Sequence, residues 1–229
     1  MHNITHPPRI LRPLFGAAII LLSSFAGSAH AQNVPTLREG DTILTTKLID
    51  ENGAQISLSS PGQATILTFI FTRCAAMQFC PKMNAQFEAL QARAKTDETI
   101  NPRLISISLD PEFDRPERLK EYGEAIGADP AIWHFATGST EAIDTLTKAF
   151  RVHRDDSAGV LNHTLCTALV APDGTIQKIW RGNAWKVEEV LDEIKSSNAF
   201  ANPSGKSFSV CRGWMTATRC KSTAGSVCN

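Results

Sequence analysis

The apolar residues of this chain fall into two patterns, continuous runs and runs with a helical period. The run 64–71 is rich in β-branched and aromatic residues and predicts a central strand buried on both faces; 103–109 predicts a second one. Over 82–95, apolar residues recur every three to four positions behind Pro81, which predicts a helix. The other predicted elements are strands over 42–49, 54–58, 132–135, 165–170 and 176–180 and helices over 114–126, 139–150 and 186–194.

Turn and cap residues separate these elements. The segments 50–53 and 171–174 each end in glycine, which accepts a positive φ, and both predict hairpin turns. Asp114 is interpreted as a helix N-cap. Strands that alternate with helices, followed by a closing hairpin and helix, predict an α/β fold with a mixed central sheet flanked by helices. The order fits a single thioredoxin-like domain over residues 36–196.

The two ends of the chain differ from this domain. Residues 1–31 have a basic start, an apolar run and a small-x-small end at Ser28–Ala31, which predicts a secretory signal peptide. An uncleaved membrane anchor is the alternative, although the apolar run is shorter than the about 20 residues that a span needs. Residues 197–229 are rich in Ser, Ala, Thr and Gly and are expected to form a poorly ordered, cysteine-containing tail. We therefore expect an exported, periplasmic protein.

Composition narrows the class of partner. Hydrophobic residues make up 42% and charged residues 20% of the 229 positions, which excludes collagen-like, disordered and multi-span membrane proteins. Lys and Arg number 23, as do Asp and Glu, so no nucleic acid partner is expected.

All six cysteines follow the predicted signal peptide, so they belong to an oxidising compartment. There, thiols persist only when they are buried, bound to metal or kept reduced by a thiol reductant. The sequence does not pair them. In particular, it leaves open whether Cys166 is a buried thiol or is linked to the tail cysteines, which are Cys211, Cys220 and Cys228.

Cys74 and Cys80 carry the candidate chemistry. Cys74 follows the predicted central strand and Cys80 opens the next helix, with five residues between them. Ligands of open α/β sheets bind at this end of the strands, and a helix N-terminus is expected to lower a thiol pKa. We interpret the two as a redox-active pair, with a structural disulfide as the alternative; the sequence does not show which thiol attacks first.

A histidine close to the two cysteines would distinguish a copper site from a simple dithiol site. His163 precedes the predicted strand 165–170, in a loop that the fold places beside the cysteines, whereas His134 fits a core or edge strand and His153 a solvated loop. Two thiolates and an imidazole suit copper in either oxidation state. The candidate copper ligands are therefore Cys74, Cys80 and His163. Met77 is interpreted as a gap-filling or exposed residue rather than as a ligand.

Three motifs carry a family resemblance: "ATILTFIFTRC…FCPKM", "SISLDPEFDRPERLKEYGEAIGADPAIWHFATGS" and "LNHTLCTALVAPDGTI". In this order they resemble the SCO/SenC family of thioredoxin-fold proteins over about residues 40–196. The resemblance implies a copper-binding metallochaperone that assists assembly of the copper site of cytochrome c oxidase, with ligands at Cys74, Cys80 and His163. The implied partners are the copper-site subunit of the oxidase, or another periplasmic copper protein, and a thiol reductant. For Asp110 and Asp114 we expect only loop structure and local charge.

The sequence departs from the family at the cysteines. The common family motif is Cys-Pro-x-x-Cys-Pro, whereas here five residues separate the cysteines and Ala75 replaces the first proline. We interpret this as a branch with longer spacing. A thiol–disulfide oxidoreductase that reduces the target cysteines is the second hypothesis, but 131–171 lacks the proline that usually faces such a dithiol. A peroxiredoxin-like thiol peroxidase is third, because Thr72 stands two residues before Cys74 rather than three.

Overall fold

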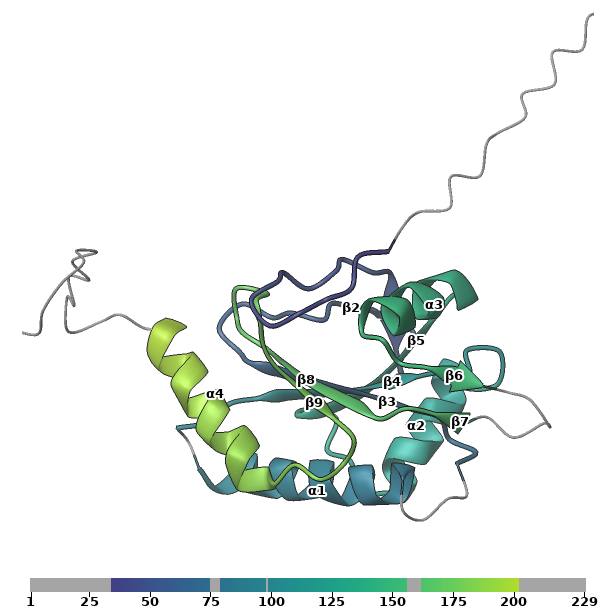
Figure 1. Cartoon of the computed structure of the whole chain (residues 1–229). Helices are drawn as coiled ribbons and strands as arrows, with labels where there is room; N and C mark the ends of the chain where they lie inside the picture. Colours follow the sequence, from purple (N-terminus) through teal and green to yellow (C-terminus); the bar gives the residue numbers. More distant parts are fainter. Residues whose placement is uncertain (1–33, 75–78, 98, 156–161, 202–229) are drawn as a thin grey trace, which may run out of the picture. The chain divides into compact units, whose positions relative to one another are not determined.

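The computed structural model describes residues 34–74, 79–97, 99–155 and 162–201 (Figure 1). The first half contains β1 (Leu48–Asp50), β2 (Gln55–Ile56), β3 (Thr65–Ile70), α1 (Cys80–Thr96), β4 (Arg103–Ser108) and α2 (Pro116–Ala125). The second half contains β5 (Trp133–Gly138), α3 (Thr140–Ala149), β6 (Arg154–Asp155), β7 (Asn162–His163), β8 (Cys166–Val170), β9 (Ile176–Arg181) and α4 (Val187–Ala201).

Seven strands form one mixed sheet in the order β2-β1-β5-β4-β3-β8-β9. β3 is parallel to β4 and antiparallel to β8, so this strand lies inside the sheet, as its apolar run predicts. Among the described strands, β6 and β7 pair with each other in a separate two-stranded sheet. The mixed sheet between helices confirms the predicted fold class.

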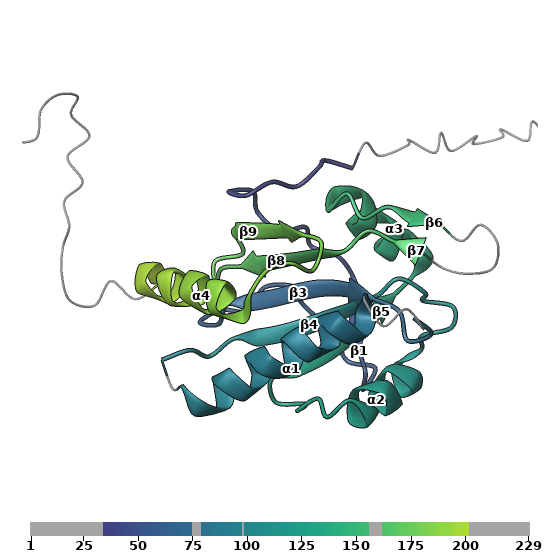
Figure 2. The same cartoon turned by 60° about the horizontal axis from the view of Figure 1, so that its bottom comes forward.

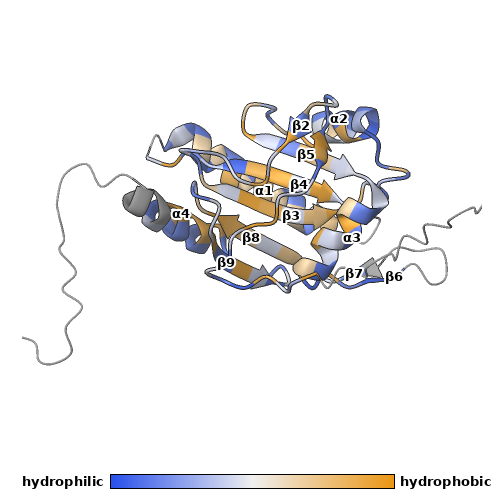
Figure 3. Ribbon diagram, turned by 90° about the horizontal axis from the view of Figure 1, so that it is seen from above, coloured by the Kyte–Doolittle hydropathy of each residue, from blue (hydrophilic) through white to orange (hydrophobic). Residues whose placement is uncertain are grey.

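The sheet is covered on both faces (Figure 2). Along β3, Ile66 and Ile70 pack with side chains of α1, α2 and α4, whereas Leu67 and Phe69 pack with α3 on the other face. Successive strand residues point to opposite faces, so the mostly apolar run of β3 supplies both cores at once. Figure 3 shows the hydrophobic colour along β3 and β4.

The two predicted hairpin turns are present, with positive φ at Gly53 (78°) and Gly174 (88°). The N-cap of α3 is Ser139, whose hydroxyl accepts a hydrogen bond from the amide of Ala142. The N-cap prediction at Asp114 is wrong: Arg115 is the N-cap of α2 and makes no side-chain cap hydrogen bond. The Asp114 carboxylate is buried and takes its hydrogen bonds from other elements, as described below.

The predictions for the chain ends lie mostly outside the described residues. Residues 1–31 and 202–229 are not described, and these include Cys211, Cys220 and Cys228. The last helix ends at Ala201 rather than near Ile194. Within the described ranges, no helix combines the length and apolar character needed to cross a membrane.

Candidate metal centre

The two thiols lie on a cysteine arm, which we define as residues 71–74 and 79–83. β3 ends at Ile70, the amide of Cys74 donates to the Phe71 carbonyl at 3.3 Å, and α1 begins at Cys80. Cys74 is half-buried and Cys80 is 1% exposed, and both are free thiols. An incoming molecule can therefore approach the sulfur of Cys74 more readily than that of Cys80.

The pKa of the Cys80 thiol is raised, so the expected lowering by the helix N-terminus is wrong for this residue. Burial is the main cause, because it disfavours the thiolate, and a hydrogen bond with the Cys74 thiol acts in the same direction. Hydrogen bonds with the backbone of Phe71 and of Cys80 oppose the rise without cancelling it. The protein without metal therefore holds Cys80 as a neutral thiol, whose proton a bound metal ion would displace.

A buried carboxylate fixes the start of the cysteine arm. Asp114 is 0% exposed and accepts hydrogen bonds from the Thr72 amide (3.0 Å), the Thr72 hydroxyl (2.5 Å) and the Ser108 hydroxyl (2.6 Å). Next to it, Arg73 pairs with Asp110 at 2.5 Å. The DPEFD segment thus has the loop-structural role expected from the sequence, and it does so by joining β3 to the end of β4.

The imidazole lies on a histidine arm, which we define as residues 152–155 and 162–164 and which contains the β6–β7 pair. The His163 ring is half-buried and packs edge-on against Phe71, with ring centroids 5.7 Å apart. Its Nδ1 lies 3.1 Å from the Thr164 carbonyl oxygen and its Nε2 lies 3.8 Å from Cys80 Sγ. A carbonyl only accepts hydrogen bonds, so Nδ1 carries the proton and Nε2 presents its lone pair to the sulfur.

Burial lowers the pKa of His163 below its ordinary value, while the hydrogen bond to the Thr164 carbonyl opposes part of that shift. The neutral ring, which is the form that binds metals, is therefore favoured at neutral pH.

The pair formed by Cys80 and His163 has the separation of two ligands of one ion. A thiolate sulfur and an imidazole nitrogen bound to one first-row metal lie about 3.5–3.9 Å apart, given bonds of about 2.3 and 2.0 Å. In the described part of the chain, however, no three His, Cys, Asp or Glu side chains form a cluster that could hold a metal ion as it stands. Cys80 thus contacts both Cys74 and His163, while a three-ligand site needs a further approach of Cys74 and His163.

The other candidate residues lie elsewhere. His134 is on β5, with Nδ1 3.5 Å from the buried Glu51 carboxylate, and His153 is exposed, as the sequence predicts. Cys166 is a buried free thiol on β8, and burial raises its pKa to about 11. Met77 lies outside the described residues.

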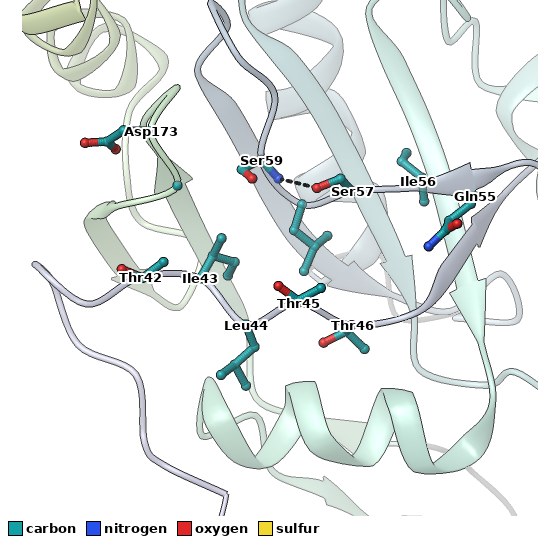
Figure 4. A pocket seen from close by; sticks show the side chains of 12 residues that line it. Thr42, Ile43, Leu44, Thr45, Thr46, Gln55, Ile56, Ser57, Ser59 and Asp173 are labelled. Atoms are coloured by element: carbon teal, nitrogen blue, oxygen red, sulfur yellow. Dashed lines mark hydrogen bonds between the residues drawn. The ribbon is translucent and has the colours of Figure 1, made fainter.

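A cleft of about 360 Å³ shares none of these residues (Figure 4). Residues 42–46, residues 55–59 and the turn at Asp173 and Gly174 line it, and the Ser59 amide donates to the Ser57 hydroxyl at 3.3 Å. These residues precede β3 or lie in the β8–β9 turn, whereas the thiols follow the carboxyl end of β3.

Sequence reasoning did not find three of the residues that shape the site. The Phe71 ring packs against the His163 ring, and the Thr72 amide donates a hydrogen bond to Asp114. Arg154 donates a hydrogen bond from the histidine arm to the Leu109 carbonyl. The spacing of Asp114 and Thr72 in the sequence gives no sign of their contact. The sequence could not show that Arg154 lies opposite His163, because strands of two residues are too short to have a recognisable hydrophobic period.

This geometry defines a thioredoxin-like protein with two thiols at the end of its central strand and an imidazole beside them. The SCO1/SenC family model matches residues 38–199, and the chain belongs to this family.

Relatives and solved structures agree with this membership. The SCO1 protein homolog of Bacillus subtilis is 31% identical over 155 residues, which cover 65% of this chain and 79% of the relative. The structure of BsSco, described with a disulfide switch and as a member of the Sco family of cytochrome c oxidase assembly proteins, has a TM-score of 0.59 and 29% identity and covers 72% and 96% of the two chains. The copper-bound ScoI of Bradyrhizobium japonicum has a TM-score of 0.54 and 26% identity and covers 70% and 99%.

Proposed function

We propose that this protein carries one copper ion on Cys74, Cys80 and His163 and delivers it during assembly of the copper site of cytochrome c oxidase. The contact between Cys80 Sγ and His163 Nε2 at 3.8 Å carries the proposal, because the nitrogen presents its lone pair to the sulfur. Family membership and a copper-bound relative support the identity of the metal. Thiolates suit Cu(I) and an imidazole also supports Cu(II), so the donor set accepts both oxidation states.

Each side chain has a separate task in this function. Cys80 and His163 retain the ion inside the protein, and Cys74 is the ligand that an acceptor can replace, since its sulfur is more accessible. Binding of the ion displaces the thiol protons, and copper leaves when ligands of the acceptor take the place of the protein sulfurs one after another. The acceptor is the copper-site subunit of the oxidase or another periplasmic copper protein.

The five residues between the cysteines are more than the common family motif has, which supports membership of a branch with longer spacing. In the described structure the three ligands do not yet form a metal cluster. We assign the movement that completes the three-ligand site to Cys74, because it is the more exposed of the two thiols.

Export to the periplasm belongs to the same proposal. The basic start, apolar run and small-residue end of segment 1–31 support a signal peptide. In an oxidising compartment the dithiol needs a thiol reductant, because only the reduced pair binds copper.

Thiol–disulfide exchange is the second candidate function, and the closeness of the Cys74 thiol, which contributes to the raised pKa of Cys80, favours it. In this reaction the two thiols become a disulfide and lose two electrons and two protons, while a disulfide of the target protein gains them and becomes two thiols. The half-buried Cys74 attacks first, and Cys80 then resolves the mixed disulfide.

Copper titration of the reduced protein tests the proposed ligand set. We expect about one copper per chain in the wild type and a weaker complex with a changed absorption spectrum in His163→Ala. The loss should exceed the about 10-fold to 100-fold that follows removal of an outer partner of a metal ligand. His153→Ala is the matched control, since His153 is exposed on the same arm. Unchanged stoichiometry and spectrum in His163→Ala would remove the ligand assignment.

A further inference from the structure

The histidine arm lies outside the main sheet. The His163 ring on this arm must nevertheless come close to the sulfur of Cys80, whose position follows from the main sheet. Within the described part of the chain, β6 and β7 pair with each other, with Arg154 opposite His163 and Asp155 opposite Asn162. Within the arm, the Thr164 amide donates to the His153 carbonyl at 2.9 Å. These contacts shape the arm but do not fix its distance from the cysteine arm.

Arg154 supplies contacts that leave the arm. Its Nη1 donates to the Leu109 carbonyl and its Nη2 to Asp144 Oδ1 on α3, both at 2.8 Å. The Arg154 side chain is 27% exposed, so the guanidinium is partly screened from water. A planar guanidinium that donates in two fixed directions defines both the distance and the orientation of the group that carries it.

Leu109 is also joined to β3, the strand that leads into the cysteine arm. The Leu109 amide donates to the carbonyl of Ile70, the last residue of β3, at 2.8 Å. Leu109, the residue after β4, is thus bonded to β3 through its N–H, while its carbonyl accepts a hydrogen bond from Arg154. The following residues reinforce this support, because Asp110 pairs with Arg73 and Asp114 accepts from Thr72.

We propose that Arg154 is a positioning residue for His163, and that Leu109 is the shared support that sets the separation of the cysteine and histidine arms. The proposal rests on the proposed copper function. It assigns to Arg154 no contact with the metal; the side chain acts through the strand register that places His163 opposite it.

The test compares Arg154→Met, which keeps the length of the side chain and removes its donors, with Arg154→Lys and Asp144→Asn. We expect Arg154→Met to bind copper about tenfold more weakly than the wild type in competition with a chromophoric Cu(I) chelator, with a shifted Cu(II) absorption spectrum. Arg154→Lys should be intermediate, since one ammonium cannot reproduce the two-directional contact. Asp144→Asn should lose less, because the bond to the Leu109 carbonyl remains.

Amide hydrogen exchange without metal supplies a second measurement. In Arg154→Met the Thr164 amide should exchange about tenfold faster, while the Leu109 amide, bonded to β3, should keep its protection. Lys195→Met is the matched control, since it removes an ion pair of 3.1 Å between α4 and Asp97 at the far end of α1. Lys195→Met should change neither the copper affinity nor the exchange rate of the Thr164 amide.

Two results would overturn the inference. One is an Arg154→Met protein with wild-type copper affinity and wild-type exchange at Thr164. The other is faster exchange throughout the sheet, which would make Arg154 a general stabiliser of the fold. If the wild-type protein binds no copper, the proposed function fails, and the exchange measurement still decides whether Arg154 positions the arm.

Discussion

The cysteine arm and the histidine arm meet at one site but are built in different ways. The cysteine arm continues the inner strand β3 into α1, and the buried Asp114 carboxylate holds its first residues. The histidine arm is a separate two-residue pairing, held by the ring contact with Phe71, by Arg154 and, at its start, by the buried Val152, whose amide donates to the Thr147 carbonyl at 2.7 Å. Changes in the cysteine arm should therefore reduce folding stability more, whereas changes in the histidine arm should mainly affect binding.

The largest effect on stability is expected on the cysteine side. Asp114→Ala removes the acceptor of the Thr72 amide and of the Thr72 and Ser108 hydroxyls, and buried donors without a partner are costly. We expect the free energy of unfolding to fall by about 3 kcal/mol, measured by urea denaturation. His153→Ala, an exposed change on the histidine arm, should stay within about 0.5 kcal/mol of the wild type. Equal losses in the two variants would contradict the contrast between the arms.

The three described thiols should differ in reactivity. In the native, reduced protein Cys74 should react with an alkylating reagent at least about tenfold faster than Cys80 or Cys166, because thiolate formation and access control reactivity. Cys80 is 1% exposed with a raised pKa, and Cys166 is 0% exposed. Mass spectrometry of peptides from a time course measures the three rates.

The same asymmetry determines mixed disulfides with a partner protein. Cys80→Ser should accumulate them through Cys74, and Cys74→Ser should accumulate few, since the remaining sulfur is buried. Efficient trapping through Cys80 would show that the cysteine arm opens further than the structure indicates.

The smallest effect is the pH dependence that His163 adds to stability. Its pKa is lowered in the folded state, so the unfolded chain binds a proton first when the pH falls below about 6.5. The contribution is complete above that pH and is lost as the pH falls through the folded pKa. We expect the Tm of the metal-free wild type to decrease more between pH 7 and pH 5 than that of His163→Gln. An equal decrease in the Tm of the two proteins would indicate that the His163 ring is more exposed to water than the structure shows.

The sequence predicts the cysteine arm better than the histidine arm, for physical reasons. A β-branched run that ends in Cys74 and a proline after Cys80 are local signals, and the structure confirms the strand and the helix that they predict. The place of His163 followed only from the fold, because two-residue strands leave no pattern. Asp114 shows the limit of local signals. It stands where an N-cap is expected, but its hydrogen-bond partners are Thr72, just after β3, and Ser108, the last residue of β4.

In the proposed copper site, the hydrogen-bond partner of the His163 ring has a consequence for release of the ion. Many metal-binding histidines donate their second ring proton to a carboxylate, which makes the coordinating nitrogen more basic. Here the second proton goes to the neutral peptide oxygen of the next residue. Such an imidazole is a milder donor, correctly oriented but without the added electron density of an anionic neighbour. That property suits a protein whose task ends only when the cargo has left it.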